Sequence, residues 1–190
     1  MNLRFLFYRN VTRQSFLPGA LLPVLTVLTA LGLNAAGLSH AHAQSYVDAA
    51  DWKEIDVPPP PAFDMAKLIT FDVTVNSALT YGVDPASVTI SNTDSVVRYV
   101  MVAFSASGSK NVMYEGLRCS TGEVKTYARY TPDGRWVPVA DAKWRSVFDV
   151  TTPPHSRRFA KAGACDSAAP VGSVRELVAK LKNPALKFSN

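Results

Sequence analysis

The stretch VVRYVMVAFSASGSKNVMYEGLRC, residues 96–119, decides the fold. Its first run, 96–104, consists mainly of β-branched, aromatic and other apolar residues, which is typical of a strand buried on both faces. Residues 105–109 supply turn chemistry, and 111–119 then returns as a second strand. The two runs predict an antiparallel hairpin in which Tyr114 lies on one face and Glu115 on the other.

Shorter runs extend this hairpin on both sides. Turn residues such as Asp84-Pro85 and Asp133-Gly134 separate them, and strands joined by such short loops form an antiparallel meander. The additional strands are expected at 67–75, 88–90, 124–130 and 135–137. We therefore predict a mainly β (or α+β) fold with a single antiparallel sheet.

A short helix is predicted near the C-terminus. Ser173 stands three residues before Glu176, the spacing of a capping box, and an apolar stripe of helical period follows over 174–181. The helix either caps one end of the sheet or forms a tail that recognises a partner. We divide the chain into a signal peptide (1–43), a proline-rich lead-in strap (44–66), a β-rich domain (67–166) and a C-terminal helical tail (167–190).

The N-terminal segment has the pattern of a secretory signal peptide. Arginines are its only charged residues, an apolar run follows, and Ala41-His42-Ala43 is a small-residue cleavage site. An earlier cleavage after Ala36 and an uncleaved membrane anchor remain as alternatives. Removal of the segment lowers the formal net charge of +5 by three, so whole-chain basicity does not indicate a nucleic-acid partner. We expect a periplasmic protein with membrane contact only through an uncleaved signal segment.

The strap places acidic residues around Trp52 and then runs through Pro58-Pro59-Pro60-Pro61, which favours an extended polyproline conformation. It is interpreted as a semi-rigid segment laid over the domain with Trp52 as its anchor. The alternative is a peptide that docks in an aromatic groove of another protein.

Cys119 and Cys165 are the only cysteines, and an even number in an exported protein predicts a disulfide. Two free thiols are the alternative. Together with His155, the single histidine after residue 43, the cysteines fall short of the four ligands of a structural zinc site. The sequence predicts no metal site and no cofactor.

Motifs that carry catalysis are missing from the sequence. There is no G-x-S-x-G, H-E-x-x-H, P-loop or glycine-rich dinucleotide turn. His155 follows two prolines and is interpreted as part of an exposed loop. Glu115 and Arg118 are interpreted as a structural ion pair or a solvated face. The alternative function is a small periplasmic hydrolase that uses carboxylates near Glu115 and Glu123.

Several runs resemble the cryptic neisserial protein-like family, an uncharacterised group of bacterial envelope proteins. They are YGVDPASVTI (81–90), the 96–119 hairpin, TGE (121–123), and DGRW (133–136) followed by Trp144-Arg145. The similarity covers about Trp52 to Cys165, and NVMYEGLRC is its most specific run. The VDPAS run and the two-cysteine layout more loosely resemble the surface-adhesin protein E family. The first resemblance implies a periplasmic or membrane-associated location, no established activity and no catalytic residue.

We predict a non-enzymatic binding or structural module of the cell envelope, whose partner is an unknown envelope protein or cell-wall component. The aromatic residues of the sheet are interpreted mainly as core. The predicted binding surface consists of Tyr114, Glu115, Arg118, Ser107 and Lys110.

Overall fold

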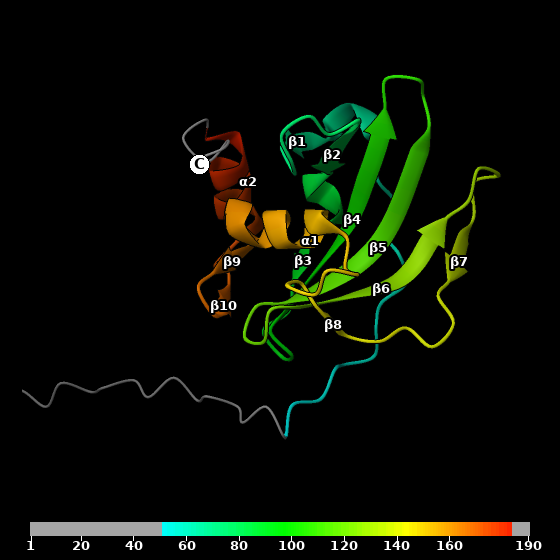
Figure 1. Cartoon of the computed structure of the whole chain (residues 1–190). Helices are drawn as coiled ribbons and strands as arrows, with labels where there is room; N and C mark the ends of the chain where they lie inside the picture. The colour runs from blue at the N-terminus through cyan, green and yellow to red at the C-terminus, as the bar shows by residue number, and fades with distance from the viewer. Residues whose placement is uncertain (1–50, 184–190) are drawn as a thin grey trace, which may run out of the picture. The chain divides into compact units, whose positions relative to one another are not determined.

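One antiparallel sheet forms the centre of the computed structural model, which describes residues 51–183. The strands are β1 (Ile69–Phe71), β2 (Leu79–Val83), β3 (Thr89–Ile90), β4 (Val96–Ser105), β5 (Lys110–Arg118), β6 (Glu123–Tyr130), β7 (Trp136–Pro138) and β8 (Arg145–Ser146). They follow the order β1-β2-β4-β5-β6-β7, with β3 paired to β4 and β8 to β6. The meander is confirmed (Figure 1). The predicted signal peptide, residues 1–43, lies outside the described residues.

The β4–β5 hairpin has the predicted register. It pairs Val96 with Arg118 at one end and Phe104 with Lys110 at the other. The predicted strand over 67–75 is much shorter in the structure, since β1 ends at Phe71. Asn76 adopts a left-handed conformation at φ 65°, which turns the chain towards β2.

Short helical segments lie before, within and after the sheet in the sequence, and a small hairpin follows it. The segments are η1 (Met65–Lys67), η2 (Pro85–Ser87), α1 (Pro154–Phe159), the π-helical η3 (Ala160–Ala164) and α2 (Val174–Lys182); β9 (Cys165–Asp166) pairs with β10 (Ala169–Pro170). The side chain of Ser173 accepts a hydrogen bond from the Glu176 N–H, as the capping box predicts. Leu177 and Leu181 are buried, so α2 docks on the domain.

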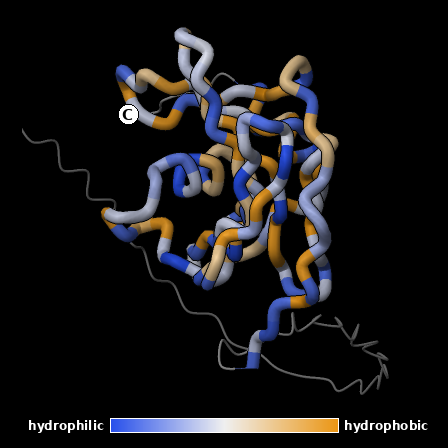
Figure 2. Tube along the Cα trace, turned by 90° about the vertical axis from the view of Figure 1, so that its right-hand side faces the viewer, coloured by the Kyte–Doolittle hydropathy of each residue, from blue (hydrophilic) through white to orange (hydrophobic). Residues whose placement is uncertain are grey.

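Two apolar cores lie on opposite faces of the sheet, because successive residues of a strand point to opposite sides. The segments α1, η3 and α2 cover one face, which we call the helix face (Figure 1). On this face, Tyr99 and Met113 pack with Phe159 and Leu177. On the strap face, strap residues pack against Val100, Val112, Tyr114 and Ala128. Figure 2 shows apolar segments interspersed with polar ones along the chain.

The disulfide joins Cys119, directly after β5, to Cys165 at the start of β9. It is confirmed, and it closes a loop with a sequence separation of 46 residues. A loop of this length contributes about 4 kcal/mol to the free energy of unfolding in the chain-entropy account. The bond ties the sheet to the helical layer. Within residues 51–183, no helix has the length and apolar character needed to cross a bilayer.

Candidate functional site

Glu115 and His155 form a buried acid–base pair on the helix face. The Nε2 atom of His155 lies 3.0 Å from Oε2 of Glu115, and the two side chains are 2% and 3% exposed. His155 is therefore not in an exposed loop, and that prediction is wrong. Pro154 occupies the first turn of α1, where its missing N–H costs nothing, so the helix begins directly before His155.

Aromatic and hydroxyl groups surround this pair. The Tyr81 ring stacks on the His155 ring with centroids 5.4 Å apart, and the hydroxyl of Thr126 donates to Glu115 Oε1 over 3.3 Å. Burial, followed by the charge of Glu115, raises the pKa of the Tyr99 hydroxyl well above its usual range, so Tyr99 stays protonated. Glu115, His155 and Tyr99 are buried, whereas Tyr81 and Thr126 are half-buried, and Thr126 also lines the opening beside β6 that is described below.

The carboxylates of Glu115 and Glu123 lie on opposite faces of the sheet. Glu123 is paired with Arg118 across β5 and β6, and directly opposite residues share a face. Arg118 lies three residues beyond Glu115 in the strand, on the other side. The interpretation of Glu115 and Arg118 as a structural ion pair or a solvated face is therefore wrong, since they lie on opposite faces and are 2% and 8% exposed. Neither Glu115 nor Glu123 lines any of the three pockets described below.

A second polar cluster holds the strap on its face of the sheet. Arg98, which is 1% exposed, donates from Nη2 to Asp94 Oδ2 over 2.5 Å and lies 3.7 Å from Oε1 of Glu54. Burial acts to raise the pKa of Asp94, but hydrogen bonds from Arg98, Ser91 and the Ile55 N–H, with the Arg98 charge, outweigh it and hold that pKa below its usual value. The strap thus contributes a carboxylate and a backbone donor to a buried charge cluster.

Glu54 is the centre of these strap contacts. Its carboxylate accepts from Lys125 Nζ at 2.8 Å, the Tyr127 hydroxyl at 2.6 Å and the Trp144 indole N–H at 3.3 Å. Trp52 donates its indole N–H to the Asp94 carbonyl over 2.8 Å. The predicted anchoring role of Trp52 is confirmed. The strap binds by directional polar contacts as well as by apolar packing.

Arg118 faces the strap as well. Its guanidinium carbon lies 3.8 Å from the centroid of the Trp52 ring, and its Nη1 is 3.5 Å from Oε2 of Glu123. A cation over an indole face is attracted by the electron density of the ring. Arg118 is therefore a structural contact for the strap, and it is not available at the surface.

A bulge in β6 directs Tyr127 toward Glu54. Tyr114 pairs with Ala128 while Glu115 pairs with Thr126, so Tyr127 is the extra residue. Gly116 makes room for it, because a Cβ on Gly116 would lie 2.2 Å from the Tyr127 hydroxyl oxygen. Burial and then the Glu54 carboxylate raise the pKa of Tyr127 above its usual range.

An accessible pocket of about 500 Å³ lies where the β4–β5 and β6–β7 turns meet the strap. We call it the hairpin pocket. The strap supplies Phe63, β5 supplies Lys110 and β6 supplies Tyr130. The Phe63 and Tyr130 rings are in edge contact with centroids 5.3 Å apart. The remaining lining residues are Met65, Gly108, Val112, Thr131 and Pro132.

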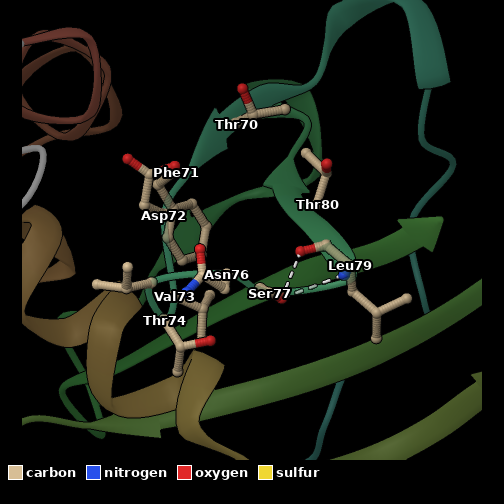
Figure 3. Close-up of a pocket in the computed structure, with 10 residues that line it drawn as sticks. Thr70, Phe71, Asp72, Val73, Thr74, Asn76, Ser77, Leu79 and Thr80 are labelled. Carbon is tan, nitrogen blue, oxygen red and sulfur yellow. Dashed lines mark hydrogen bonds between the residues drawn. The ribbon is translucent and has the colours of Figure 1, made fainter. Parts of the chain in front are cut away.

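Two other openings lie away from this pocket. One, of about 470 Å³, lies between β1 and β2, where Ser77 Oγ bonds the backbone of Leu79 (Figure 3). The other, of about 340 Å³, lies beside β6 and is lined by Arg129, Asp141 and Lys143 among others. The first opening is lined by the aromatic Phe71 but by no lysine, and the second is lined by Lys143 but by no aromatic residue. The hairpin pocket combines both kinds of side chain.

The predicted binding residues separate in the structure. Tyr114 and Glu115 are each 2% exposed and Arg118 is 8% exposed, whereas Ser107 and Lys110 are exposed on the β4–β5 turn. Only Lys110 of the five lines the hairpin pocket, and Ser107 is next to its Gly108 wall. The aromatic residues interpreted as core are buried or half-buried, which confirms that interpretation.

Sequence reasoning missed the role of Arg98. An arginine inside the apolar run 96–104 is a signal that could have found it, since a buried guanidinium requires a carboxylate partner.

Within residues 51–183, no group of three or more His, Cys, Asp or Glu side chains is placed to hold a metal ion.

The sequence model of the CNP1-like family matches residues 47–182. The chain belongs to the CNP1-like family. The match spans the strap, the sheet and α2, so both faces of this CNP1-like domain are within it. The more specific resemblances, to the cryptic neisserial protein-like and surface-adhesin protein E families, stay predictions. No similar curated protein and no similar solved structure was found.

Proposed function

We propose that this protein is a non-enzymatic binding module of the cell envelope, exported to the periplasm, which holds an envelope protein or cell-wall component in the hairpin pocket. The hairpin pocket itself carries the proposal. It is open, it is built jointly by the strap and two hairpins, and it combines two aromatic rings with one lysine.

The chemistry of the lining limits the ligand. Aromatic rings of Phe63 and Tyr130 favour an apolar group or the face of a sugar ring. The ammonium group of Lys110 favours a carboxylate at the mouth of the pocket. A ligand that offers an acidic group beside an apolar or sugar moiety fits both features. Peptides and carbohydrate polymers of an envelope contain such combinations.

A catalytic role has less support from the geometry. The hydrolase alternative required carboxylates that act together, and Glu115 and Glu123 lie on opposite faces. His155 faces Glu115 but is 2% exposed and stacks against Tyr81. A binding role needs only the accessible groups that the hairpin pocket already presents.

Capture on immobilised protein tests this function. Tyr46–Asn190 is a compact unit with its own core and is the species to immobilise. It is exposed in turn to a detergent extract of envelopes and to a cell-wall digest. We expect one of the two sources to yield a retained component, and we expect Lys110→Glu and Tyr130→Ala to lose it.

The matched control is Lys161→Glu, the same charge reversal at an exposed position on η3. It is expected to retain the component. The proposal is wrong if neither source yields a component, or if Lys110→Glu retains as much as Lys161→Glu does. Export is tested separately by osmotic-shock fractionation of cells that produce the full chain, with the periplasmic fraction as the expected location.

A further inference from the structure

The loop between β8 and α1 exposes two apolar side chains that the pocket does not use. Phe148 is 63% exposed and Val150 is 98% exposed. Phe148 is the only exposed aromatic residue within residues 51–183. We call residues 146–152 the apolar loop. Phe148 and Val150 are two positions apart, so this loop offers two exposed apolar side chains within three residues.

Short-range contacts hold the loop in this conformation. Val147 is buried, and its N–H donates to the Gly122 carbonyl over 2.8 Å. Two turns follow, in which the Asp149 N–H donates to Ser146 and the Thr152 N–H donates to Asp149. Because Val147 and Thr152 are buried at its two ends, the loop presents Phe148 and Val150 outward.

Positive charge flanks the exposed side chains. The guanidinium carbon of Arg157 lies 5.2 Å from the centroid of the Phe148 ring, and Arg145 is exposed at the start of β8. Asp149 is the only acidic residue between positions 143 and 157. Its carboxylate accepts hydrogen bonds from the N–H and hydroxyl of Thr151 at 2.8 and 2.9 Å. The loop therefore combines an apolar tip with a basic surround.

We propose that the apolar loop binds the surface of an anionic phospholipid bilayer, with Phe148 and Val150 inserted at the interface and Arg145 and Arg157 among the headgroups. Interfacial binding increases with buried apolar area and with attraction to anionic lipids, and the loop offers both. A stable protein interface instead buries roughly 800 Å² on each partner, far more than two side chains provide. This inference is independent of the hairpin pocket.

Sedimentation with lipid vesicles tests the proposal. The unit Tyr46–Asn190 is mixed with vesicles of phosphatidylcholine alone or of phosphatidylcholine with phosphatidylglycerol. We expect binding only to the phosphatidylglycerol vesicles, and weaker binding at high salt. Val150→Asp is expected to lower the partition coefficient by about tenfold, since it removes an inserted side chain and adds a negative charge. Arg157→Gln is expected to lower it by about fivefold.

The matched control is Val75→Asp, the same substitution at a site that is 69% exposed on the β1–β2 connection. It is expected to lower vesicle binding much less than Val150→Asp does. Thermal unfolding verifies that all variants are folded. We expect Val150→Asp to fold, because Val150 is exposed and its replacement leaves the core intact. The proposal is overturned if the wild-type unit does not sediment with phosphatidylglycerol vesicles. It is also overturned if Val75→Asp and Val150→Asp weaken vesicle binding equally. The same holds if the wild-type unit binds a protein through the apolar loop and does not bind vesicles.

Discussion

The two faces of the sheet are covered by different chemistry. On the helix face, α1, η3 and α2 bury an apolar cluster, and the Cys119–Cys165 bond ties this layer to β5. On the strap face, an extended segment is held by charged groups centred on Glu54 and by aromatic contacts. Apolar packing is non-directional, whereas hydrogen bonds and ion pairs require a defined position of each partner.

This difference assigns separate roles to the faces. The helix face holds the larger apolar core and the buried Glu115–His155 pair. The strap face holds a segment in one register, and this register places Phe63 in the wall of the hairpin pocket. The polyproline run is thus part of a layer that builds the proposed binding site. Substitutions on the helix face should change stability, and those on the strap face should also change the pocket.

The largest expected effect is on the helix face. Phe159 is fully buried and its ring contacts those of Phe71 and Tyr99. We expect Phe159→Ala to lower the free energy of unfolding by about 4 kcal/mol, as measured by urea denaturation. The matched control Phe148→Ala removes an exposed ring and should change it by about 0.5 kcal/mol or less. Similar losses in the two variants would contradict the placement of the core.

The strap face should respond next. Glu54→Gln keeps the shape of the side chain but removes the charge that faces Arg98 and Lys125. We expect a loss of about 3 kcal/mol in the free energy of unfolding, since the buried Arg98 and the partly buried Lys125 lose the negative charge of Glu54. Faster hydrogen exchange of strap amides should accompany it. The control Asp56→Asn, at an exposed strap position, should change neither the free energy of unfolding nor the hydrogen exchange of strap amides. Unchanged hydrogen exchange of these amides in Glu54→Gln would refute the role of this cluster.

A smaller effect is expected where the strap face is crowded. Gly116→Ala places a methyl group where the Tyr127 hydroxyl lies, and overpacking of this kind costs about 2 kcal/mol. Tyr127→Phe removes that oxygen. The loss in free energy of unfolding of the double variant should therefore be smaller than the sum of the losses of the two single variants. Additive losses in a double-mutant cycle would show that the Gly116–Tyr127 contact is absent.

The smallest effect concerns pH. The folded-state pKa of Asp94 is held below its usual value, so its ion pair stabilises the protein above the unfolded pKa of about 3.9. That contribution is lost as pH falls through the folded-state pKa. We expect the free energy of unfolding to decrease below about pH 4 and the Asp94 carboxyl signal to titrate late in an NMR pH series. A midpoint above the usual aspartate value would contradict the cluster geometry.

Much of the fold could be predicted because it depends on local patterns. The alternation over 111–119 predicted the correct faces of β5, and Ser173 with Glu176 predicted the start of α2. β1 was overestimated because apolar alternation continues after Phe71 although the backbone turns. Val73 remains buried there without belonging to a strand.

The candidate site could be predicted only in part. Lys110 and Ser107 were predicted as surface residues because the turn chemistry of 105–109 is a local sequence pattern. The Glu115–His155 contact spans 40 residues and the Glu54–Tyr127 contact spans 73, and nothing in either segment alone specifies its partner. Proline before His155 was interpreted as a loop signal, although proline is equally suited to the first turn of a helix.

NMR mapping of ligand contacts tests the central claim that the hairpin pocket on the strap face is the binding site. Uniformly ¹⁵N-labelled Tyr46–Asn190 is titrated with the component retained in the capture experiment. We expect the amides that shift most to cluster at 108–112 and 130–131, while those of α1 and α2 do not move. Shifts that cluster around His155 and Phe159, with Lys110 and Tyr130 unchanged, would contradict it.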